Sequence, residues 1–380
     1  LLSSMASHPM YHEYRVHQLV QETLDTVMDA ASSSIDSEDG ASIKEDLRSD
    51  ASDGCESDLE ADETHLARAH WILLHKMNKQ GTVIQSTFEH LMTEFKHTRP
   101  IWQFGRNIDE NAKDWNKELH EDFYFRHHCA SVQAAITMIM ENKDDLVALT
   151  RVLNEVGAHH FFYDAYEPHL ILFEDAMITG MKKVLHGVEE LDEETERSWR
   201  VLLQLTRKHL IEGISIQRNA YLKQAITPQE HTEITEAWAR VEEYGLEEAG
   251  VRLCETAFQT YKSLLSQYEL SLPIPAVPGS NSDVFRQFSH MTMAALDLTI
   301  NNYDQNSGFA SLPEKLSDYA ITCMILDVCP TLVRKAFMEG IMEMLKTALD
   351  KKELSETERQ TWCKVYRVLE QAILINIVDY

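Results

Sequence analysis

The sequence predicts an all-α protein in which two tandem domains follow an acidic N-terminal arm. Beyond Thr64, apolar residues recur at intervals of three and four nearly everywhere, which is the helical period, and no strand-like alternation is sustained. Segments about 163 residues apart also repeat each other. A chain of 380 residues is long enough for two domains, each with its own core.

The composition of the chain restricts the classes of molecule that it can bind. The chain holds 62 acidic and 35 basic residues, a formal net charge of -27, which repels nucleic acid phosphates and anionic lipid. No apolar run approaches the length of a membrane span, and no charged leader precedes a long apolar core. The six cysteines form no CxxC pair, as in proteins that keep reduced thiols. We therefore expect a cytoplasmic protein with no nucleic acid or membrane partner.

Residues 1–63 form the predicted arm. Residues 11–30 carry apolar side chains at helical spacing and predict an amphipathic helix. The segment from Asp36 to Glu63 holds twelve acidic and two basic residues and almost no large apolar ones. Such a segment cannot bury enough apolar surface to form a core, so we expect it to be disordered.

The first domain is predicted to span residues 64–226 and the second residues 227–380. The boundary rests on "TPQE", which places Thr227 at a helix cap, proline at the first helical position and Glu230 three residues after the cap. Within the second domain, residues 270–283 collect three of the nine prolines and predict a loop.

The two domains are predicted to be copies of one fold. "ETERSW" at 194–199 returns as "ETERQTW" at 356–362, and "FEDAMITGMKKVL" at 173–185 returns as "FMEGIMEMLKTAL" at 337–349. The phenylalanine that opens the second motif precedes the tryptophan by 26 residues in one copy and 25 in the other. A period this long is typical of a duplicated domain rather than a solenoid.

The stretch "VGAHHFFYDAY" at 156–166 raises the question of chemistry, because it ends a predicted helix with two histidines. Three interpretations of these histidines remain open at this point. They could be hydrogen-bonded core residues, ligands of a protein-bound metal or an axial ligand for a flat cofactor. His160 has a counterpart in His128, thirty-two residues upstream. Phe125, His128 and Val132 share one helix face, because steps of three and four return to the same side. Two helices could thus present two imidazoles across an apolar slot, which is what a haem requires.

Other chemistries lack support. A zinc site formed by the two histidine pairs would need a third ligand at a suitable spacing, and none accompanies them. The sequence contains no G-x-S-x-G motif, no P-loop and no Rossmann glycine pattern. We therefore expect no enzyme activity beyond incidental haem redox chemistry.

The segment from about residue 66 to 224 resembles a globin, and is similar to neuroglobin-like and nematode intracellular globins. His160 falls on the family's proximal histidine, His128 on its distal histidine and Val132 on its distal valine. "RPIWQFG" resembles the corner where a phenylalanine packs on the haem, and Phe104 is the candidate. The resemblance implies a three-over-three helical sandwich for this domain.

It also implies one haem b per chain, with the iron held by His160. His128 would either donate a hydrogen bond to a bound diatomic gas (O2, NO or CO) or occupy the sixth position of the iron. Phe104, Phe125 and Val132 would line the haem. The intracellular members of the family suggest sensing or redox chemistry rather than bulk oxygen transport.

The second domain departs from this pattern. Cys323 stands at the proximal position, Met291 at the distal one and Ala295 at the valine site. We expect this domain to be haem-free and to serve structure or partner binding, and a protein partner could bind either here or at the acidic arm. The alternative is a helical interaction scaffold, derived from globins, in which neither domain binds haem.

Overall fold

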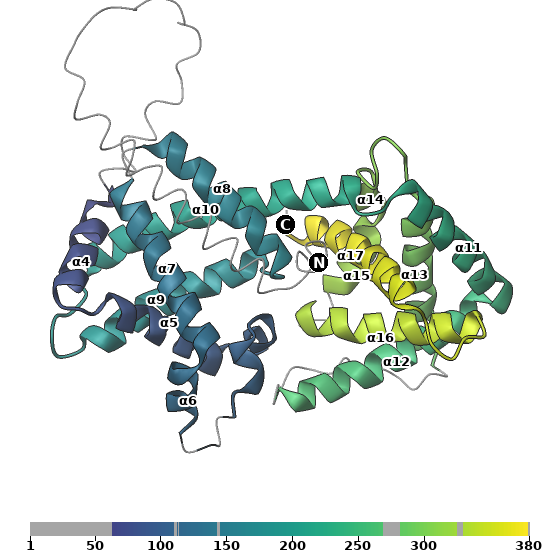
Figure 1. Cartoon of the computed structure of the whole chain (residues 1–380), viewed down its shortest axis with the longest axis horizontal. Coiled ribbons are helices and arrows are strands. Elements are labelled where there is room, and N and C mark those ends of the chain that lie inside the picture. Colours follow the sequence, from purple (N-terminus) through teal and green to yellow (C-terminus); the bar gives the residue numbers. More distant parts are fainter. Residues whose placement is uncertain are drawn as a thin grey trace, which may run out of the picture. The chain divides into compact units, whose positions relative to one another are not determined.

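The computed structural model describes residues 63–109, 112, 114–142, 145–268, 282–324 and 330–378. Within these ranges every regular element is a helix, apart from one isolated antiparallel bridge between Asp304 and Gly308. The prediction of an all-α fold is therefore confirmed (Figure 1). The predicted helix over residues 11–30, the acidic segment that follows it up to residue 62 and nearly all of the predicted proline-rich loop lie outside the described residues.

The helices of the described residues have the following bounds. In chain order they are α4 (His65–Lys76), α5 (Gln80–Glu94), η1 (Lys96–Ile101), η2 (Phe104–Asn107), α6 (Trp115–Glu121), α7 (Phe123–Glu141), α8 (Leu146–Phe162), α9 (Glu167–Leu185), α10 (Glu193–Gln224), α11 (Pro228–Tyr244), α12 (Leu246–Gln267), α13 (Asp283–Asn301), α14 (Leu312–Lys315), α15 (Ser317–Met324), α16 (Pro330–Ala348) and α17 (Glu356–Val378). No helix among the described residues is long and apolar enough to cross a membrane.

The described residues divide into two compact units. The first contains the residues up to Thr98 together with Trp102–Ser215, and the second contains Arg99–Ile101 and the residues from Ile216 onward. The division after Ser215 falls inside α10.

Side-chain caps start several of these helices where the sequence places the cap residues. Asp122 accepts a hydrogen bond from the Phe125 amide at 2.9 Å, and this starts α7. Asp145 accepts one from Ala148 at 3.0 Å and starts α8. The capping box predicted at the start of α11 is confirmed, because Thr227 and Glu230 exchange hydrogen bonds at 2.9 and 3.2 Å.

A tryptophan pair ties the first and last helices of the first unit. Trp71 of α4 and Trp199 of α10 meet edge to face, with ring centroids 5.9 Å apart. The Trp71 indole N–H donates to the Thr137 hydroxyl of α7 at 3.1 Å. Three helices therefore converge on one pair of indoles, which is buried almost completely.

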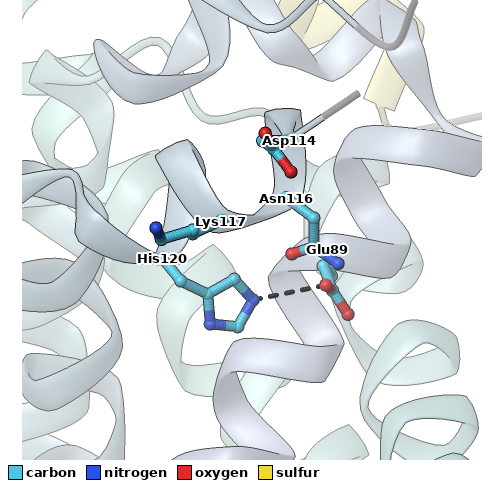
Figure 2. A pocket seen from close by; sticks show the side chains of 5 residues that line it. All are labelled: Glu89, Asp114, Asn116, Lys117 and His120. Atoms are coloured by element: carbon cyan, nitrogen blue, oxygen red, sulfur yellow. Dashed lines mark hydrogen bonds and ion pairs between the residues drawn. The ribbon is translucent and has the colours of Figure 1, made fainter. Parts of the chain in front are cut away.

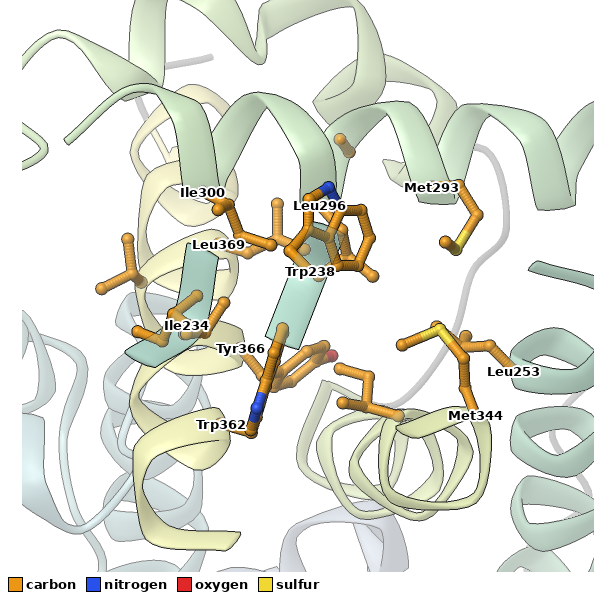
Figure 3. Close-up of a cluster of buried hydrophobic side chains, with 14 of the residues drawn as sticks. Ile234, Trp238, Leu253, Met293, Leu296, Ile300, Met344, Trp362, Tyr366 and Leu369 are labelled. Atoms are coloured by element: carbon orange, nitrogen blue, oxygen red, sulfur yellow. The ribbon is translucent and has the colours of Figure 1, made fainter. Parts of the chain in front are cut away.

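The second unit repeats this arrangement at the centre of its own core (Figure 3). Trp238 of α11 and Trp362 of α17 have ring centroids 6.2 Å apart. The Trp238 indole N–H donates to the carboxylate of Asp297 in α13 at 2.9 Å. In each unit, then, the indole of the earlier helix also bonds to a helix from the middle of that unit.

Helices α8 and α10 cross with their backbones in contact. A Cβ atom added to Gly157 would overlap the Leu210 carbonyl oxygen, and one added to Gly213 would overlap the Asn154 carbonyl oxygen. Neither helix tolerates a side chain at the crossing, because backbone atoms cannot move aside as a flexible side chain does. This crossing fixes the position of α8 one turn before His160.

Helix α9 begins with an unusual capping residue. The amide N–H of Tyr166 donates to Nδ1 of His169 at 3.1 Å, so that nitrogen carries no proton. Burial lowers the pKa of His169 to about 4, helped by repulsion from His97 and opposed by the carboxylate of Asp164. The neutral imidazole occupies the place that Glu or Gln fills in a usual capping box.

We predict that Gly213→Ala lowers the free energy of unfolding of the first unit by about 2 kcal/mol, because the new methyl group forces two backbones apart. Urea unfolding followed by circular dichroism measures this. The control is Gly81→Ala, whose Cβ would meet only the flexible Gln133 amide at 3.2 Å. Equal effects of the two substitutions would contradict the close crossing.

We predict that His169 makes the first unit less stable in acid. Its folded pKa lies below the unfolded value of about 6.5, so its contribution is complete above pH 6.5 and is lost as the pH falls from there toward 4. At pH 5 this loss is about 2 kcal/mol. His169→Gln keeps an acceptor for Tyr166 but cannot titrate, so urea unfolding at pH 7.5 and 5.0 should show a smaller difference for the variant. An unchanged difference would show that His169 is not responsible, and exposed His186→Gln serves as control.

Candidate functional site

Helix α7 presents three of the predicted site residues on one face. Phe125 is fully buried, while His128 and Val132, three and seven residues further on, are half-buried. Phe125 and Val132 both pack in the hydrophobic core of the first unit. The prediction that this segment forms a helix is confirmed, and the spacing then places the three side chains on one side.

Aromatic rings from two other segments surround His128. Phe88 of α5 meets its imidazole edge to face with ring centroids 4.8 Å apart. Phe104, the first residue of η2, lies 6.0 Å away and Trp102 lies 6.4 Å away. Phe104 also meets Phe125 edge to face at 5.3 Å. The structure therefore brings together Phe104, which was predicted from the corner, and the residues predicted on α7.

The His128 imidazole is neutral in this surrounding. Burial, together with repulsion from His160 and His127, lowers its pKa to about 3. Because His160 acts on His128 electrostatically, the two predicted imidazoles belong to the same interior region of the first unit. A neutral imidazole can donate one hydrogen bond and accept another, and it can ligate a metal.

His160 stands in the last turn of α8, and its ring is held by the helix itself. Its Nδ1 lies 2.8 Å from the carbonyl oxygen of Val156, one turn earlier. A carbonyl only accepts, so Nδ1 must carry the proton, and Nε2 of the neutral ring keeps its lone pair. Burial lowers the pKa of His160, opposed by the bond to Val156, and this favours the neutral ring. The imidazole is thus prepared to coordinate a metal through Nε2.

Sequence reasoning missed part of this surrounding. Phe88 contacts both His128 and Phe173, the latter at a centroid distance of 5.8 Å, yet it belongs to a helix far from α7 in the sequence. Trp102 stacks on Phe104 with centroids 5.9 Å apart. The motif "RPIWQFG" contained both residues of this stack, so the signal for Trp102 was present, whereas nothing near Phe88 in the sequence marked it.

His127, the neighbour of His128, lies against a different aromatic ring. His127 stacks on Phe123 with centroids 6.0 Å apart, and the Phe123 ring is 64% exposed. No group of three or more His, Cys, Asp or Glu side chains suited to a metal ion occurs among the residues that the structure describes. A haem iron needs only one or two protein ligands, which is fewer than the three or more that such a group would supply.

A polar hollow lies beside this site (Figure 2). It is lined by Glu89, Asp114, Asn116, Lys117 and His120. The Glu89 carboxylate bonds to Nε2 of His120 at 3.2 Å and to Nζ of Lys183 at 3.1 Å. Burial raises the pKa of Glu89, but these partners outweigh it and the net shift is downward. The His120 ring lies 5.3 Å from Phe125, so the hollow adjoins the aromatic lining from outside.

The positions of the second unit that the sequence repeat predicts to correspond to these histidines carry no imidazole. Burial raises the pKa of the Cys323 thiol to about 11, opposed by a hydrogen bond with Tyr319, so the thiol keeps its proton at neutral pH. Met291 is half-buried against the core. Of the two histidines in this unit, His231 bonds to the Ile300 carbonyl at 2.9 Å and His290 is exposed.

The geometry agrees with one comparison. Residues 85–210, from the middle of α5 into α10, match the family model of the globins. No curated protein matches the chain. The matched range contains all five predicted site residues, namely Phe104, Phe125, His128, Val132 and His160. Residues 85–210 of this chain are therefore similar to the globin family.

Proposed function

We propose that the first unit binds one haem b through Nε2 of His160 and, with it, a diatomic gas such as O2, NO or CO. The observation that carries this proposal is the hydrogen bond between Nδ1 of His160 and the Val156 carbonyl. It selects the tautomer whose free nitrogen coordinates iron, and it fixes the orientation of the ring. The match to the globin family supports the same cofactor.

The side chains around the two histidines fit a flat apolar cofactor. His128 and His160 are surrounded by protein, yet each keeps part of its surface accessible to water. Side chains that line a recess behave in this way, whereas tightly packed core side chains do not. Phe104, Phe125 and Val132 supply apolar surface nearby, as a porphyrin requires.

A bound haem supplies an iron atom that binds diatomic gases reversibly. The Val156 carbonyl makes the His160 ring a stronger electron donor by accepting a hydrogen bond from its Nδ1–H group. Neutral His128 would either donate a hydrogen bond to the gas or ligate the iron itself. In the second case His128 must move before the gas binds, which lowers the apparent affinity by the fraction of open sites.

The second unit is proposed to be a globin-like domain that carries no haem. Two features that both units have support this proposal. A tryptophan pair joins the first and last helices, and a glycine lies where two helices cross closely. Gly180 of α9 packs against Thr87 of α5, and Gly340 of α16 packs against Leu253 of α12. Cys323 is a poor substitute for a histidine, because its protonated thiol is not the ligating form.

We infer that the protein serves in sensing or redox regulation rather than in bulk transport of a gas. A unit without an imidazole ligand would carry no gas, so a tandem chain of this kind is poorly suited to carriage. The second unit would instead support structure or bind a protein partner, as the acidic arm could. The scattered cysteines favour a cytoplasmic location.

We predict one haem per chain in protein purified after growth with ample hemin. The optical spectra of the ferric, ferrous and carbon monoxide forms, with iron quantified against protein, measure this. His160→Ala should lower haem retention at least tenfold, because loss of a direct ligand costs no less than loss of a partner that only orients it. Cys323→Ala and the exposed His186→Ala should retain the haem.

The same spectra separate the alternatives. Two haems per chain would restore Cys323 as a ligand, and a colourless protein would favour the haem-free scaffold. If His128 ligates the iron, His128→Leu should convert a six-coordinate ferrous spectrum to a five-coordinate one and raise the apparent affinity for carbon monoxide. If His128 does not ligate it, the ferrous spectrum should keep its coordination.

A further inference from the structure

Helix α4 is fastened to α10 by consecutive residues of α10. The Ser198 hydroxyl accepts a hydrogen bond from the Ala67 amide at 3.0 Å and donates one to the Glu63 carbonyl at 2.6 Å. It therefore holds the first turn of α4, where amide groups lack partners within the helix. Trp199, the next residue, is fully buried and contacts α4 one turn further along.

The contact between Trp199 and α4 depends on an unprotonated imidazole. The Trp199 indole N–H donates to Nδ1 of His70 at 2.9 Å, and the rings meet edge to face with centroids 6.1 Å apart. An indole N–H can only donate, so Nδ1 must hold a lone pair and the proton of neutral His70 must lie on Nε2. His70 is only 8% exposed, so water offers little substitute for this bond.

Protonation would turn this contact from attractive to repulsive. An imidazolium carries N–H groups on both nitrogens, and the one at Nδ1 would face the indole N–H of Trp199. The new charge would also be buried, which costs free energy. Burial lowers the pKa of His70, while the carboxylates of Glu189 and Asp192, just before α10, raise it in part. These two are the charged groups that act on the ring.

We propose that His70 and Trp199 form an acid-sensitive latch that holds α4 on α10 at neutral pH and releases α4 when His70 takes up a proton. Release would also separate Trp71 from Trp199 and from Thr137 of α7, because Trp71 follows His70 in α4. The latch involves neither predicted iron ligand, so it stands whether or not haem is bound.

The direction of the pH effect follows from the sign of the shift. The pKa of His70 is lower with α4 docked than in the released, solvated state, where it is near 6.5. The latch is therefore complete above pH 6.5 and weakens as the pH falls below it. At pH 5.5 the population with α4 released should rise relative to pH 7.5, by at most roughly tenfold, because the released state binds the proton more strongly.

Hydrogen exchange of the full chain at pH 7.5 and 5.5, corrected for intrinsic rates, tests this proposal. In the wild type, protection of the α4 amides should fall at pH 5.5 by up to roughly tenfold more than protection in α8. His70→Gln offers Trp199 an amide oxygen but cannot titrate, so protection of its α4 amides should fall no more than protection in α8. His290→Gln, an exposed histidine of α13, is the matched control and should behave as the wild type.

Comparison of α4 with α8 separates local release from general acid unfolding, to which other buried histidines contribute. If α4 and α8 lose protection in step, or if His70→Gln responds to acid as the wild type does, the latch is wrong. The Trp199 indole N–H resonance gives a second measurement that does not need a variant. Its hydrogen exchange, corrected in the same way, should speed up between pH 7.5 and 5.5 more than exchange in α8 does, and an indole that exchanges only in step with α8 would also overturn the proposal.

Discussion

The chemistry of the first unit depends on one hydrogen bond, from Nδ1 of His160 to the Val156 carbonyl. This bond lies within α8, so the orientation of the ring is set by the helix rather than by a distant partner. The position of α8 is set in turn by its backbone contact with α10 at Gly157. The glycine at the crossing of α8 thus sets the position of the imidazole. The Val156 carbonyl of the same helix determines that Nε2 is the nitrogen that stays unprotonated.

The sequence could predict whatever depends on local spacing. Three- and four-residue steps place Phe125, His128 and Val132 on one helix face, and the structure has a helix there. The capping box at Thr227 is equally local, since its two partners are three residues apart. Trp71 could be marked as a core residue but not as a partner of the Thr137 hydroxyl, because that bond exists only once two helices have crossed.

The surroundings of His128 show where sequence reasoning ends. Phe88 packs closest to its ring, yet forty residues separate them, and many pairs of aromatic residues have such a separation. His70 is a similar case, since its partner Trp199 lies 129 residues away. Both contacts depend on the angle and register at which helices pack, and the period of one helix does not contain this information.

The two units differ in how burial acts on the residue at one position. Burial disfavours the charged form of any side chain. For His160 the uncharged form is the one that coordinates a metal, so burial and ligation favour the same state. For Cys323 the ligating form is the thiolate, and burial raises its pKa to about 11, which opposes ligation. If the two positions correspond as proposed, thiol in place of imidazole would remove the ligand without a change of fold, and the hydrogen bond of neighbouring Tyr319 is too weak to offset the effect of burial.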